Sequence, residues 1–142
     1  MRSSRRRFVF LLVPALLVGA CGEENQQDDM LEATLRAYAI TMRWSELDQA
    51  IGFINPADLQ ANPMSKLELE RYRQVRVVGY QEQGVLRPEP GLARQNVTIE
   101  IVNQHTQIAR TVVDLQEWRY DPVTKKWWLT SGLPKLTAED TR

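Results

Sequence analysis

Apolar residues change their spacing along the chain, and each spacing predicts a different kind of element. A continuous apolar stretch over residues 8–18 is followed by a polar run over residues 22–30. From residue 31 the apolar side chains recur every three or four positions, which is the period of one helix face. From residue 75 the period is two, which is typical of strands with one buried face. The pattern therefore predicts helices first and strands afterwards.

Three helices are predicted before the strands. The first presents an apolar face made of Leu31, Leu35, Tyr38 and Met42. The second covers residues 47–54 and ends at Asn55, because the residue before a proline avoids helical geometry. Ser65 and Glu68 then form a Ser-x-x-Glu capping box, which predicts a short third helix to about residue 73.

The second half of the chain predicts an antiparallel meander. Its first strand begins at Val75 and continues past Gly79, as a bulge, towards Val85. After a loop, further strands are expected at 97–101, 111–120 and 126–130, with connections at 87–91, 103–106 and 121–125. Helices followed by such a meander predict one α+β domain over residues 31–134, with two to three N-terminal helices packed on a curved, cone-like antiparallel sheet. A frayed tail is expected over residues 135–142.

This order of elements resembles the nuclear-transport-factor-two-like superfamily, which includes ketosteroid isomerase. The resemblance rests on the two amphipathic helices within residues 30–54, the third helix near 65–73 and the closing hairpin over 118–129, and it covers about residues 30–134. It implies that the helices close the concave side of the sheet into a cone with a pocket. Members of this superfamily include enzymes, binding proteins and scaffolds, so the fold alone does not give the function.

Residues 1–20 have the three-part layout of an export signal. Four arginines precede the apolar stretch, and the small residues Gly19 and Ala20 follow it. Eleven apolar residues are too few to span the hydrocarbon core of a bilayer, which disfavours the alternative of a retained membrane helix. Residues 4–9 are also similar to the twin-arginine export motif. The alternative is that the arginines only supply the positive charge that secretory signals carry.

The signal ends in Leu17-Val18-Gly19-Ala20-Cys21, which resembles the lipobox of bacterial lipoproteins. In that family a diacylglyceryl group is attached to the cysteine thioether and the chain is cut before this residue. The resemblance implies that Cys21 is lipidated, with acyl chains such as palmitate, and that residues 21–30 form a flexible acidic tether. Gly22, in place of the aspartate that favours inner-membrane retention, implies the inner leaflet of the outer membrane, with the domain facing the periplasm.

Composition narrows the chemistry of the exported part. Without the four arginines of the signal, 14 Lys and Arg stand against 18 Asp and Glu, and this acidic balance argues against a nucleic-acid partner. A single cysteine excludes a disulfide within the chain. With one histidine, His105, and no Gly-rich phosphate loop, no metal site and no cofactor are expected.

Two acids on predicted strands, Asp114 and Glu100, are candidates for a general base, with Tyr38 or Tyr80 as hydrogen-bond donors. The alternation of strand residues favours a simpler interpretation, in which both acids are solvated partners of apolar neighbours. His105 lies in a predicted turn, where a surface position is expected. No catalytic residue is therefore assigned.

Four aromatic residues cluster around the closing hairpin and are candidates for an interaction site: Trp118, Tyr120, Trp127 and Trp128. Adjacent residues of a strand point to opposite faces, so one of the neighbouring tryptophans is expected to face outward. Exposed aromatic residues are common anchors for protein partners. The alternative is cross-strand packing that stiffens the hairpin.

The leading prediction is a lipid-anchored envelope lipoprotein that acts as a non-enzymatic module and binds an envelope protein or a small apolar ligand. One alternative is a small pocket enzyme of the isomerase or hydrolase type that uses Asp114 or Glu100. Another is a structural factor in the assembly of an envelope complex. A buried carboxylate in a closed pocket favours the enzyme, whereas exposed aromatic residues favour the binding module.

Overall fold

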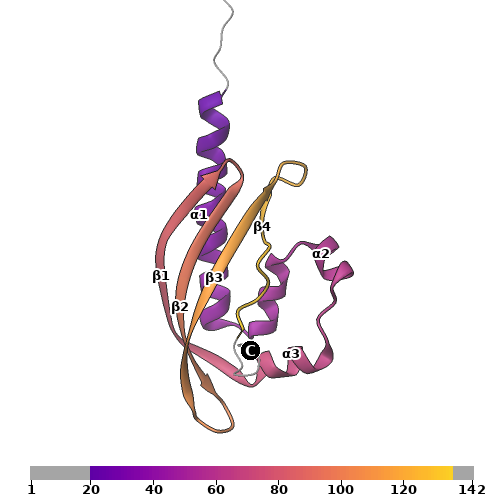
Figure 1. Cartoon of the computed structure of the whole chain (residues 1–142), viewed down its shortest axis with the longest axis vertical. Helices are drawn as coiled ribbons and strands as arrows, with labels where there is room; N and C mark the ends of the chain where they lie inside the picture. The colour runs from indigo at the N-terminus through magenta and orange to yellow at the C-terminus, as the bar shows by residue number, and fades with distance from the viewer. Residues whose placement is uncertain (1–19, 136–142) are drawn as a thin grey trace, which may run out of the picture.

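The structure, a computed structural model, describes residues 20–135 and has the α+β architecture that the sequence predicts (Figure 1). Four helical segments come first: α1 (Ala20–Trp44), the 3-10 helix η1 (Leu47–Phe53), α2 (Pro56–Ala61) and α3 (Lys66–Arg73). Four strands follow: β1 (Val75–Glu89), β2 (Leu92–Asn103), β3 (Ala109–Asp121) and β4 (Lys126–Leu129). They form one antiparallel sheet in the order β1-β2-β3-β4. Except for Ala20 and Lys135, the predicted signal and tail lie outside the described residues.

The polar run over residues 22–30 forms the first turns of α1, so the prediction of a flexible tether there is wrong. Composition alone suggested a tether because this run offers almost nothing to bury. Two contacts hold it against the sheet instead. Trp127 donates a hydrogen bond from Nε1 to the backbone oxygen of Gln27 at 3.0 Å, and Asp28 forms an ion pair with Arg87 of β1.

Local capping explains the short helices that follow. η1 ends before Asn55-Pro56, as predicted, but it is a 3-10 helix. α2 was not predicted from the sequence. It has Pro56 in its first turn, where the missing N–H of proline has no hydrogen bond to lose. The side chain of Asn55 accepts a hydrogen bond from the N–H of Ala57 at 2.9 Å. The capping box is confirmed: Ser65 Oγ accepts from the N–H of Glu68 at 3.2 Å, and the N–H of Ser65 donates to the Glu68 carboxylate at 2.7 Å.

The strands follow the predicted meander with one difference. The bulge predicted in β1 is confirmed by a shift of register between Val77 and Gly79. β1 continues to Glu89, so the loop predicted over residues 87–91 shrinks to a tight turn at residues 90 and 91. Gly91 adopts a φ of 74° in this turn, a conformation that glycine reaches without strain. The hairpin between β3 and β4 is confirmed.

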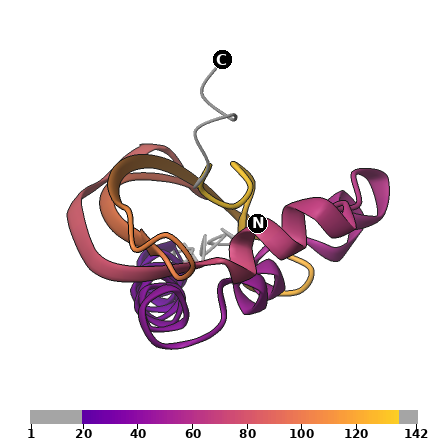
Figure 2. The same cartoon turned by 90° about the horizontal axis from the view of Figure 1, so that it is seen from below.

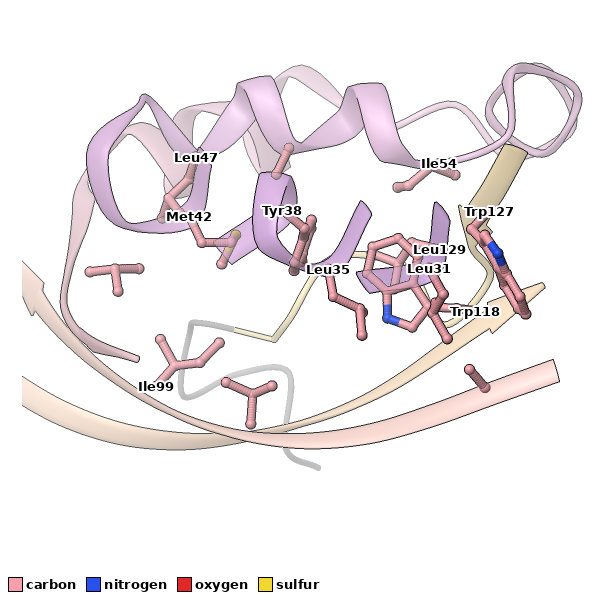
Figure 3. Packing of buried hydrophobic residues seen from close by; sticks show 14 of the residues in the cluster. Leu31, Leu35, Tyr38, Met42, Leu47, Ile54, Ile99, Trp118, Trp127 and Leu129 are labelled. Carbon is pink, nitrogen blue, oxygen red and sulfur yellow. The ribbon is translucent and has the colours of Figure 1, made fainter. Parts of the chain in front are cut away.

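The core lies between α1 and the concave side of the curved sheet (Figures 2 and 3). All four residues of the predicted apolar face of α1 are buried, and so are the inward residues of β2 at 97, 99 and 101. Three aromatic rings meet edge to face at the centre. Tyr38 lies 5.2 Å from Phe53 and 5.2 Å from Trp118, and Phe53 lies 6.3 Å from Trp118, measured between ring centroids.

The segment from residue 56 to residue 73, which we call the arm, carries α2 and α3 at the edge of this core, and Leu59 and Tyr72 pack against the core from it. Neither helix has a buried residue. Figures 1 and 2 show both helices to one side of the sheet and α1. The arm is tied back to the end of the chain by Tyr72, whose hydroxyl donates to the backbone oxygen of Pro134 at 3.1 Å. Apart from Leu59 and Tyr72, the arm therefore offers a surface that does not pack against the core.

Candidate functional site

The four aromatic residues predicted as an interaction site divide between the core and the surface. Trp118 has an exposed fraction of 0% and Trp127 of 4%, so both are core residues, and the prediction that they anchor a partner is corrected. Tyr120 packs on Trp127 with 5.5 Å between ring centroids, which is the cross-strand alternative. Trp128 is half-buried on the opposite face from Trp127. The Nζ of Lys126 lies over its ring, 5.6 Å from the ring centroid.

Of the two candidate acids, Glu100 is exposed as expected, but Asp114 is buried with an exposed fraction of 6%. The prediction of a solvated Asp114 is therefore wrong. The reason is that, in this part of β3, polar residues face the concave side of the sheet and apolar residues face outward, which reverses the usual alternation. Asp114 and Gln116 point into the concave side, whereas Val113 and Leu115 point outward and are exposed.

Hydrogen bonds join the inward polar residues into one cluster, which we call the buried polar cluster: Tyr80, Asp114, Gln116 and the indole N–H of Trp118. The Nε2 of Gln116 donates to Asp114 Oδ2 at 2.8 Å and to the Tyr80 hydroxyl at 3.0 Å. In return, Gln116 Oε1 accepts from Trp118 Nε1 at 3.2 Å. A side-chain amide bridges well here because it supplies both donors and an acceptor.

Burial shifts the proton equilibria of this cluster. Loss of hydration raises the pKa of Asp114 to about 6, although the hydrogen bond from Gln116 opposes this shift. Burial also raises the pKa of Tyr38 well above its ordinary value, and the nearby Asp114 adds to this effect. The Tyr38 hydroxyl has no hydrogen-bond partner among residues 20–135. The Asp114 carboxyl therefore keeps its proton to a higher pH than an exposed aspartate does.

A groove with a volume of about 550 Å³ lies between the arm and the last described residues, and we call it the arm groove. Its apolar lining comprises Ile54, Leu59, Met64, Tyr72 and Leu133. Asp58, Glu68, Arg71 and Lys135 add charges of both signs, and Asn62, Thr130, Ser131 and Gly132 complete the lining. The sequence does not predict this groove, because residues that are distant in the chain build it. The prolines at 56 and 63, which mark an irregular segment, were its only local signal.

Further findings concern the metal-ligating residue types, His105 and the helices in the part of the chain that the structure describes. No group of three or more His, Cys, Asp or Glu side chains there is arranged to hold a metal ion. His105 is exposed in the turn after β2, where its backbone N–H donates to the Asn103 side chain at 2.9 Å. None of the helices within residues 20–135 has the length and apolar character needed to cross a membrane.

Comparisons of the chain with protein-family models, with curated proteins and with solved structures found no match. The resemblances to bacterial lipoproteins and to the nuclear-transport-factor-two-like superfamily therefore stay predictions.

Proposed function

We propose that this protein is a lipid-anchored component of the bacterial cell envelope that binds a partner protein through the arm groove, without catalysis. The lipobox-like ending at Cys21 supports the anchor, and Gly22 supports the outer membrane with the domain in the periplasm. α1 begins one residue before Cys21, so acylation there would hold the domain close to the bilayer surface. Each buried methylene contributes about 0.8 kcal/mol, and two acyl chains are enough for stable anchoring.

The arm groove is the observation that carries the binding role. Its volume falls in the range of about 300–1000 Å³ that is typical of ligand sites. The apolar side chains of Leu59, Met64 and Leu133 can take an apolar group, while charged residues of both signs lie beside them. This lining suits a protein segment with an apolar anchor and polar flanks better than a purely apolar small molecule.

The second candidate function is acid–base catalysis at Asp114, and the raised pKa of this carboxyl favours it. A general base must reach the proton that it removes. The Asp114 carboxyl is instead bonded to Gln116, and Asp114 is not among the residues that line the arm groove. The binding role therefore explains more of the described surface.

Photo-crosslinking in living cells tests the binding role. A photoreactive phenylalanine at Leu59, inside the arm groove, is expected to give one discrete adduct of higher mass after illumination. Leu67 is the matched control, because it is an exposed leucine on α3 that does not line the groove. The proposal predicts no such adduct from position 67. An identical pattern from both positions, or none from either, would contradict a partner in the groove.

A further inference from the structure

The sheet has one unpaired edge on β1 and a second on the part of β3 that β4 does not cover. β4 pairs with β3 only over residues 118–121, and the N–H of Thr130 extends this contact to the backbone oxygen of Glu117. Within residues 20–135, no strand pairs with residues 109–116 on this side. We call residues 109–116 the free edge. Its backbone groups on that side are available to another strand.

The two edges of the sheet differ in how they are protected. β1, at the other edge, shifts its register three times and contains Pro88, two features that prevent strands from adding to an edge. The free edge belongs to a strand that pairs with β2 in eleven consecutive positions without a shift. It contains no proline, glycine or lysine. The sheet is therefore open to strand addition on the β3 side.

Apolar side chains stand on the outer face of the free edge. Val113 has an exposed fraction of 61% and Leu115 of 65%, in positions that alternate with the buried Asp114 and Gln116. β-Branched and aliphatic residues on an edge without bulge or proline favour pairing with another strand, although the edge also carries two charged residues, Arg110 and Asp114. Because like edges of antiparallel strands are complementary, a two-fold axis can place this edge against itself.

We propose that the free edge pairs in antiparallel fashion with the free edge of a second copy of this chain, which joins two four-stranded sheets into one. Charge complementarity supports this occupant. With Val112 opposite Val112 of the second copy, Arg110 lies opposite Asp114, and the two-fold axis repeats this pair. Both residues occupy even positions of β3, on its inward face, so the pairing satisfies strand alternation. On the outer face, Thr111 then lies opposite Val113.

Sedimentation of the lipid-free protein tests the proposal without the anchor. Residues 21–142 with Cys21→Ser, which keep the described elements apart from Ala20, are expected to sediment as a dimer at about 0.1 mM. Val113→Lys is expected to give a folded monomer, because a lysine at an edge blocks strand pairing. Val78→Lys is the matched control, since Val78 is 53% exposed on the protected strand β1, and the dimer should persist. Circular dichroism verifies that each variant is folded.

Disulfide trapping tests the pairing directly and does not depend on the lysine variants. In the Cys21→Ser background, an equal mixture of Thr111→Cys and Val113→Cys chains is expected to form a disulfide-linked heterodimer on mild oxidation. A mixture of Val78→Cys and Val113→Cys chains should not. A wild-type domain that is monomeric at 0.1 mM, or equal crosslinking in the two mixtures, would overturn the proposal. In the case of a monomer, the free edge would instead be available for pairing with a strand from a different protein.

Discussion

Replacing Trp118 with alanine is expected to lower the free energy of unfolding by about 3–5 kcal/mol, the range for large aromatic residues in a packed core. Trp118 is fully buried and packs edge to face against Tyr38 and Phe53. Its indole N–H also donates to Gln116, so the substitution leaves a buried acceptor without this donor. Because most small domains are stable by only about 5–15 kcal/mol, the variant is expected to be close to unfolding.

Urea denaturation followed by circular dichroism measures this loss. Trp44→Ala is the matched control, because Trp44 ends α1 with an exposed fraction of 75%. Its substitution should change the free energy of unfolding by less than about 0.5 kcal/mol. Equal effects of the two substitutions would contradict the assignment of Trp118 to the core, and would restore its predicted role as a surface anchor.

Replacing Asp114 with asparagine is expected to stabilise the monomeric domain at pH 7 by up to about 3 kcal/mol and to remove part of its pH dependence. The pKa of Asp114 is raised from 3.8 to about 6 because the carboxyl is buried. The folded state therefore binds the proton more tightly than the unfolded chain does. The stability that protonation provides is fully present below about pH 4 and is lost as the pH rises through 6.

The difference between wild type and Asp114→Asn, measured by urea denaturation from pH 4 to pH 8, isolates this carboxyl. Glu117 and Asp121, whose pKa values are lowered mainly by hydrogen bonds from Arg94 and Thr124 respectively, are present in both proteins, so their contributions cancel. The asparagine oxygen can still accept from Gln116, which keeps the cluster intact. A difference that stays constant with pH would contradict the burial of an ionisable Asp114.

Much of the fold could be predicted from the sequence because its local signals agree with its packing. The helical spacing from Leu31 to Met42 matched the buried face of α1. The box formed by Ser65 and Glu68 gave the start of α3, and Gly79 gave the bulge in β1. In each case the residue types that favour the element are also the ones that its surroundings require.

The errors arose where distant residues decide the structure. The polar run before residue 31 is helical although composition indicated a tether, and Trp127 contacts it across 100 positions of sequence. Asp114 points to the concave side of the sheet, where its carboxyl accepts from Gln116, which in turn donates to Tyr80. The arm groove joins segments near residues 60 and 132. Because these segments are far apart in the sequence, no local sequence pattern predicts that they meet.

The anchor is the central claim, and metabolic labelling with a clickable palmitate analogue tests it most directly. The wild-type chain is expected to incorporate the label and to remain in the membrane fraction. Cys21→Ser, which removes the only cysteine, is expected to lose the label. An unlabelled wild-type protein in the soluble fraction would contradict the account, and so would label that persists in Cys21→Ser.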